Sequence, residues 1–163
     1  MAQTRYDELM KLRDNDRERI AQSTVCVKGK EIPWETNPQG IMKWYMHPCN
    51  DSTAHKFLIF ASQQIPAGSR SGKLKHQGGI VVVVVEGKGY TTIDGVRYDW
   101  KQGDIVQLPI KPEGIAFQHF NTGTEPALLI HAEPNLAGTV GIDRGCGFEQ
   151  IEAAPEYSGP KNA

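Results

Sequence analysis

The sequence lacks the long apolar run, the paired cysteines and the basic clusters that mark several classes of protein. Its longest apolar run, Ile80–Val85, is far too short to cross a bilayer, so no contact with a membrane is expected. Cys26, Cys49 and Cys146 are odd in number and have no CxxC spacing, which excludes a disulfide framework. A formal charge of -1 without a basic run argues against binding to nucleic acid.

Two further absences narrow the function and the location. The sequence contains neither a GxSxG nucleophile motif nor a phosphate-binding P-loop. Its charged N-terminal segment has no apolar block of the kind that a secretory signal contains. Because cysteines outside a disulfide framework suit a reducing compartment, we expect a cytoplasmic protein.

The chain does contain one helical pattern, placed before many short strands. Its 163 residues are enough for one domain with a single core. Residues 4 to about 22 are predicted to form a helix that begins with a capping box, Thr4 and Asp7. The helix has only a thin apolar stripe among many charges, so it would lie on a surface or against a partner.

From Ile41 onward the sequence predicts β-strands. Runs such as IMKWYM, IVVVVV, IAFQHFN and ALLIHAE are rich in branched and aromatic residues and are separated by turn residues. Asp94–Gly95 between two such runs predicts a hairpin. The pattern indicates an all-β sandwich or barrel, and a jelly roll is among the options. We divide the chain into an N-terminal helix and extended arm (1–40), a barrel (41–135) and a C-terminal arm with a loose tail (136–163).

Glycine, proline and histidine recur at informative spacings in the middle of the barrel. The first group of positions comprises Gly68, Leu74, His76, Ile80 and Gly87. The second comprises Gly103, Pro109, a three-residue insertion, and then Gly114, Phe117 and Asn121. In order and spacing, these groups resemble the two motifs of the cupin superfamily.

The resemblance implies a cupin double-stranded β-helix, that is, a jelly-roll barrel with a short N-terminal helix. It also implies that the family's four metal ligands fall at Leu74, His76, Ile80 and Phe117. Only His76 has a lone pair to offer a metal ion. We therefore expect no catalytic residue and no metal in this chain, and we expect these four side chains and His119 to line the pocket of the barrel.

A displaced metal site is the alternative. Residues two apart on a strand share a face, so His119 should point inward as Phe117 does. His131 lies on the last predicted strand of the barrel, with Glu133 on the same face. His76, His119 and His131, together with Glu133, could then hold iron or manganese. The other interpretation is that the first two histidines are hydrogen-bonded pocket residues and His131 lies near a surface.

The Tyr98–Trp100 segment after the hairpin resembles the gentisate dioxygenase branch of the cupins. That branch cleaves dihydroxylated aromatic rings with ferrous iron. In length, in motifs and in the hydrocarbon residues at the metal positions, the chain is most similar to small subunits of two-component hydroquinone 1,2-dioxygenases.

This resemblance implies a partner, a larger cupin subunit that carries Fe(II), in a hetero-oligomer; a homodimer is also open. The candidate contact surfaces are the N-terminal helix, residues 23–46 and residues 136–150. Two other functions remain open from the sequence. One is a stand-alone metal enzyme acting on a small aromatic or carboxylate substrate, and the other is a cupin that only binds a small ligand.

Overall fold

The computed structural model describes residues 4–50, 52–54, 56–135 and 149–160. Within these residues the chain forms α1 (Arg5–Ala21) and the strands β1 (Glu35–Asn37), β2 (Gly40–Met46), β3 (Leu58–Ile65), β4 (Lys73–His76), β5 (Val81–Glu86), β6 (Lys88–Ile93), β7 (Val96–Lys101), β8 (Ile105–Gln107), β9 (Ile115–Asn121), β10 (Ala127–Pro134) and β11 (Glu149–Glu152). The expected all-β class with one N-terminal helix is confirmed.

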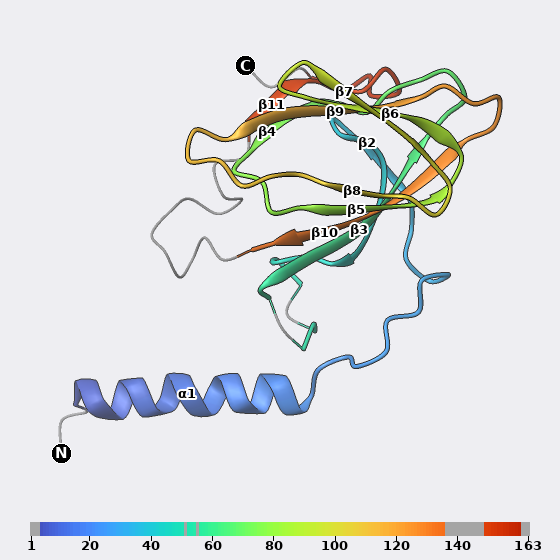
Figure 1. Cartoon of the computed structure of the whole chain (residues 1–163). Coiled ribbons are helices and arrows are strands. Elements are labelled where there is room, and N and C mark those ends of the chain that lie inside the picture. Colours follow the sequence, from blue (N-terminus) through green and yellow to red (C-terminus); the bar gives the residue numbers. More distant parts are fainter. Residues whose placement is uncertain (1–3, 51, 55, 136–148, 161–163) are drawn as a thin grey trace.

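The helix begins where the sequence predicts, at a capping box. The Thr4 hydroxyl accepts a hydrogen bond from the Asp7 backbone N–H at 3.1 Å, and the Asp7 carboxylate accepts one from the Thr4 N–H at 2.9 Å. No residue of Arg5–Ala21 is buried, and α1 projects away from the strands (Figure 1). Near its end, Arg19 donates to the Thr53 carbonyl at 3.0 Å. Among the described residues, no helix combines the length and the apolar character that crossing a membrane requires.

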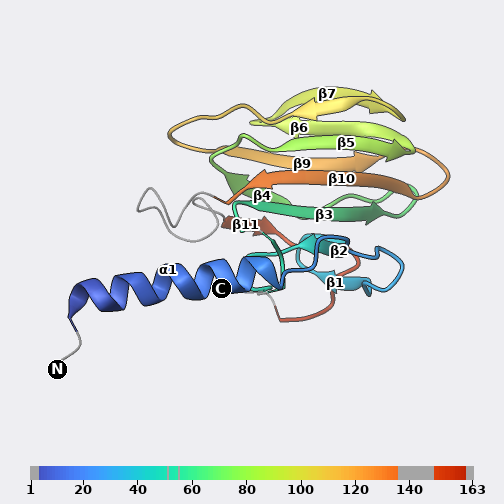
Figure 2. The ribbon, with the colours of Figure 1, turned by 90° about the horizontal axis from the view of Figure 1, so that it is seen from below.

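The strands form two antiparallel sheets that face each other (Figures 1 and 2). The six-stranded sheet has the order β1-β2-β3-β10-β5-β8, and the five-stranded sheet has the order β11-β4-β9-β6-β7. From β3 to β6 the chain changes sheet at every step, and β9 and β10 return to the middle of the two sheets. This winding is a double-stranded β-helix, so the jelly-roll barrel expected from the resemblance is confirmed.

The hairpin between β6 and β7 forms at the predicted turn. Asp94 and Gly95 have φ values of 49° and 84°, the left-handed conformation that a type I′ hairpin turn requires at both central positions. The strands pair in register from Ile93 opposite Val96 to Lys88 opposite Lys101. The turn thereby sets which face of β7 looks into the barrel.

The sheets also take in strands from either side of residues 41–135. β1 pairs with β2, and β11 pairs with β4, where Glu149 lies opposite Lys75. Of the predicted C-terminal arm, residues 136–148 lie outside the described residues, and so does Cys146. Cys26 and Cys49 are exposed free thiols.

The core lies between the two sheets. It is a single cluster of apolar side chains: Ile65, Leu74, Ile80, Val82, Val84, Ile93, Trp100, Val106, Leu108, Ile115, Phe117, Ala127 and Leu129. Leu74, Ile80 and Phe117, three of the four positions that the resemblance assigns to metal ligands, belong to this cluster. The candidate site is therefore part of the packed core.

Candidate functional site

The four positions that correspond to metal ligands lie together inside the barrel. Leu74 and His76 are on β4, Ile80 precedes β5, and Phe117 is on β9. Leu74 lies directly opposite Phe117 in the antiparallel pairing of β4 with β9. All four side chains are buried, with at most 7% of any residue exposed. Burial and the pairing of β4 with β9 thus place these side chains in the interior between the sheets.

His76 is held by the tight turn that follows β4. Its Nδ1 accepts a hydrogen bond from the Gly78 backbone N–H at 2.9 Å, so the ring hydrogen must sit on Nε2. That Nε2 lies 3.2 Å from Oε1 of Glu133 on β10, close but not aligned for a hydrogen bond. The contact joins an imidazole of one sheet to a carboxylate of the other.

His119 is held through a chain of hydrogen bonds that crosses three strands. Its Nδ1 lies 2.7 Å from the hydroxyl oxygen of Thr91, which is its register partner on β6. That same oxygen accepts a hydrogen bond from the Trp100 indole N–H on β7 at 2.9 Å. Thr91 is fully buried, so its hydroxyl hydrogen is directed to the His119 Nδ1. The ring hydrogen of His119 then sits on Nε2, which is buried and has no hydrogen-bond partner within the described chain.

His131 on β10 faces His119 edge to face across the barrel, with the ring centroids 5.3 Å apart. Its Nε2 is also buried and finds no partner among the residues described. Burial lowers the pKa of His131 to about 4, although the nearby Glu133 carboxylate acts in the opposite direction. Burial also places the pKa of His119 well below its usual value, and His131 adds to this effect. Both rings are therefore neutral at pH 7.

The residues at the four positions do not fit a resident metal, because the side chains of Leu74, Ile80 and Phe117 have no lone pair. Among the described residues, no group of three or more histidine, cysteine, aspartate or glutamate side chains is arranged to hold a metal ion. The displaced set of His76, His119 and His131 stays a prediction. Its support is that each of the three rings has a buried Nε2 without a hydrogen-bond partner.

Sequence reasoning did not identify Thr91 and Trp100 as supports of His119. Thr91 is an ordinary strand threonine in the sequence, and only the pairing of β6 with β9 brings it to the imidazole. The available signal in the sequence was spacing, because Thr91 lies two residues before the apolar Ile93 and so shares its face of the strand. The predicted pocket-lining role of the five inward residues stays a prediction.

The comparisons with known proteins agree with this fold. Residues 61–133 match the cupin domain family. The matched residues run from β3 to β10, which is the part of the chain that winds as a double-stranded β-helix. None of the curated proteins compared with the chain gives a significant match.

Solved structures share the fold at low sequence identity. A cupin-like protein from Thermotoga maritima is 18% identical with a TM-score of 0.54, over 73% of this chain and 87% of that one. A predicted oxalate decarboxylase from the same organism is 22% identical with a TM-score of 0.53, over 66% and 96%. A Klebsiella pneumoniae protein with a double-stranded β-helix domain is 16% identical with a TM-score of 0.57, over 80% and 99%. At these identities the likeness concerns the fold alone.

Proposed function

We propose that this chain is the non-catalytic cupin subunit of an aromatic ring-cleavage dioxygenase of the hydroquinone 1,2-dioxygenase type. A larger cupin subunit carries the Fe(II) and the chemistry. The observation that carries the proposal is the packing of Leu74, Ile80 and Phe117 into the apolar core at the positions of family metal ligands. The resemblance of the Tyr98–Trp100 segment to the gentisate dioxygenase branch supplies the substrate class.

The chemistry of ferrous iron supports this division of work. A non-haem ferrous site needs two or three imidazoles, often with a carboxylate, and open positions for substrate and dioxygen. Hydrocarbon side chains at three ligand positions leave neither donors nor open space there. The packed interior instead gives a rigid scaffold, since well-filled cores tolerate little change of volume.

The helix supports the presence of a partner. Tyr6, Leu9, Leu12 and Ile20 are large apolar side chains of α1 that stand exposed, and the helix covers no face of the barrel (Figure 1). A lone helix of this length is marginal in water without tertiary contacts. The second candidate contact surface, residues 23–46, also exposes apolar side chains, including Val25 and Trp34. Most of the third, residues 136–150, lies outside the described residues.

Co-expression with a larger cupin subunit encoded beside this chain tests the proposal. We expect the two proteins to co-purify and to cleave hydroquinone only together, with iron bound to the larger subunit. Leu9→Ala with Leu12→Ala should weaken the complex, whereas Lys11→Ala with Glu18→Ala on the same helix should not. Failure to co-purify, or full activity of the larger subunit alone, would show that the proposal is wrong.

The unpartnered Nε2 atoms favour a second candidate function, a stand-alone enzyme with iron or manganese at His76, His119 and His131. It would act on a small aromatic or carboxylate substrate. Metal analysis of the isolated chain separates the two candidates. Stoichiometric metal that survives dialysis and is lost in His76→Ala would favour this candidate over the subunit.

A further inference from the structure

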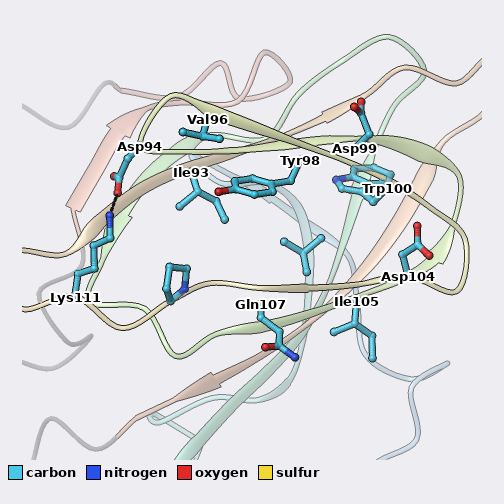
Figure 3. A pocket seen from close by; sticks show the side chains of 12 residues that line it. Ile93, Asp94, Val96, Tyr98, Asp99, Trp100, Asp104, Ile105, Gln107 and Lys111 are labelled. Atoms are coloured by element: carbon cyan, nitrogen blue, oxygen red, sulfur yellow. Dashed lines mark hydrogen bonds and ion pairs between the residues drawn. The ribbon is translucent and has the colours of Figure 1, made fainter.

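A cavity of about 650 Å³ opens between the edge strands of the two sheets (Figure 3). β7 is the last strand of the five-stranded sheet and β8 is the last strand of the six-stranded sheet. The lining comprises Ile93, Asp94, Val96, Tyr98, Asp99, Trp100, Asp104, Ile105, Val106, Gln107, Pro109 and Lys111. A volume of this size lies within the range of small-molecule sites.

The walls are aromatic and apolar where they enter the barrel. Val96, Tyr98 and Trp100 alternate along β7 and so share its inward face. Trp100 is buried at 4% exposure, but Val96 and Tyr98 remain 55% and 49% exposed. The inward face of β7 thus continues beyond its cover from the other sheet. Removing this apolar face from water would favour ligand binding by about 25 cal/mol for each Å² that the ligand covers.

One end of the cavity carries polar groups with unused hydrogen-bonding capacity. The Tyr98 hydroxyl is directed toward the end that holds Asp94 and Lys111 (Figure 3), and it makes no hydrogen bond with any described residue. Lys111 donates to Asp94 at 2.6 Å, and Asp94 also accepts from the Ala116 N–H at 2.9 Å. An ammonium group has three hydrogens, so Lys111 can still donate to a ligand.

The charges around the cavity select for an uncharged head group. Lys111 and Asp94 neutralise each other, and Asp99 pairs with Arg97 at 2.6 Å, so Asp104 leaves one net negative charge at the other end. An anionic ligand would therefore be repelled. A cationic head group gains little at the end that holds Tyr98 and Lys111, because Asp94 there already pairs with Lys111 at 2.6 Å. A ligand hydroxyl suits the end that holds Lys111 and Tyr98, since it can accept a hydrogen bond from Lys111 and donate one to the Tyr98 hydroxyl.

We propose that the cavity between β7 and β8 binds a small uncharged phenol of one or two rings. The ring packs between Tyr98, Val96 and Val106, and the hydroxyl meets Tyr98 and Lys111. This site goes beyond the proposed function, because it uses none of the family ligand positions and needs no partner subunit. The buried Trp100–Thr91–His119 hydrogen bonds connect its wall to an imidazole inside the barrel.

Three probes with the same ring system test the proposal on the isolated full-length chain. They are 2-naphthol, 2-naphthoate and 2-(aminomethyl)naphthalene, titrated at pH 7 and followed by chemical shifts of the backbone amides. We expect 2-naphthol to bind with a Kd below about 1 mM and to shift amides of β7 and β8. The anion and the cation should bind at least about 5-fold more weakly.

A matched pair of variants localises the binding. Tyr98→Phe removes the free hydroxyl and keeps the ring, so the Kd for 2-naphthol should rise about 5-fold, as expected for the loss of one hydrogen bond. Tyr90→Phe removes a hydroxyl from β6, on a tyrosine stacked against Phe120, and should leave the Kd unchanged. No saturable binding, equal or tighter binding of either charged probe, or an equal effect of the two variants would overturn the proposal. A second copy of the chain in the cavity would also overturn it, and sedimentation would reveal the dimer.

Discussion

Phe117 packs into the apolar core at a position that the cupin resemblance assigns to a metal ligand. It lies opposite Leu74 on β4 and opposite Ile93 on β6, so it fills the middle of the five-stranded sheet's inner face. Its ring also contacts the His119 imidazole, with centroids 5.5 Å apart. A side chain surrounded in this way contributes to stability through burial and through close packing.

Restoring an imidazole at this position should therefore destabilise the chain. We expect Phe117→His to lower the free energy of unfolding by about 2–4 kcal/mol, because it removes apolar volume and buries a polar ring without a partner. Urea unfolding with and without added zinc measures the effect. Phe120→His, at a ring that stacks on Tyr90, is the control and should cost less. Equal costs, or recovery of stability with zinc, would contradict the packing argument.

His131 should make stability depend on pH. Its folded pKa is about 4, below the ordinary value of 6.5, so the unfolded chain binds a proton in this window and the folded chain does not. Stability is therefore full above pH 6.5 and falls by about 1–3 kcal/mol as the pH approaches 4. Glu133 faces the ring from the same strand and His119 faces it from the other sheet.

The variant His131→Gln isolates this contribution from the carboxylates that also titrate at low pH. With a chelator present, the difference in unfolding free energy between wild type and variant should change by about 1–3 kcal/mol between pH 7 and pH 4. Urea unfolding at several pH values gives the difference. A constant difference across this range would show that the ring is not held neutral by burial.

At the scale of elements, the β6–β7 hairpin both fixes the register of β7 and borders the cavity. Hydrogen bonding to Lys111 and to the Ala116 N–H lowers the pKa of Asp94, so its carboxylate is charged. Its φ of 49° is one that aspartate and asparagine tolerate better than alanine. The residue therefore stabilises the turn through its backbone and through its side chain.

We expect Asp94→Ala to destabilise the chain by about 1–2 kcal/mol, through strain in the turn and the loss of an acceptor for Ala116. Asp94→Asn is the matched control, since asparagine keeps both the turn conformation and an acceptor oxygen. It should cost less than the alanine variant. Thermal unfolding compares them, and equal losses would mean that the Lys111 pair dominates at this turn.

The local elements could be predicted from the sequence, whereas their long-range partners could not. The helix and its capping box, the Asp94–Gly95 hairpin and the alternating strands follow from residue types within a few positions of each other. The grouping of Leu74 with Phe117 came from the cupin resemblance, not from a local pattern. The support of His119 by Thr91 and Trp100 depends on two strand pairings, which local patterns do not specify.

The cavity was missed for a different reason. Along β7, Val96, Tyr98 and Trp100 form the alternation of an ordinary buried strand face. Whether that face is covered depends on how far the opposite sheet extends, and β8 is only three residues long. The length of an edge strand in the other sheet is not encoded near β7.

The helix α1 should fold and unfold with little effect on the barrel. Leu12→Pro removes a backbone N–H in the middle of the helix and should disrupt it, at a local cost of about 3 kcal/mol. Since no residue of Arg5–Ala21 is buried, the unfolding midpoint of the barrel should not change. Circular dichroism at 222 nm follows the helix, and tryptophan fluorescence follows the barrel. If Leu12→Pro lowers the barrel midpoint but Leu12→Ala does not, then α1 packs against the barrel in solution.

At the scale of the whole molecule, the cavity adjoins the packed interior and shares Ile93, Trp100 and Val106 with it, whereas the exposed helix lies apart from both. The interior of the barrel is packed, the open cavity lies at the β7–β8 edge, and the exposed helix projects from the other side of the fold (Figures 1 and 2). The surfaces available for binding are therefore the cavity at the β7–β8 edge and the exposed helix α1. The centre, at the positions that the resemblance assigns to metal ligands, is filled by apolar side chains.

The proposed division of work between two subunits predicts that metal removal affects their complex and not the isolated chain. Dialysis of the isolated chain against a chelator should leave its unfolding midpoint unchanged. The side chains of Leu74, Ile80 and Phe117 bind no metal that the chelator could remove. The same dialysis of the complex with the larger subunit should abolish ring cleavage, and added ferrous iron should restore it. A midpoint that falls on chelation and recovers with iron or manganese, but does neither in His76→Ala, would place a metal on the displaced histidines and contradict the division of work between subunits.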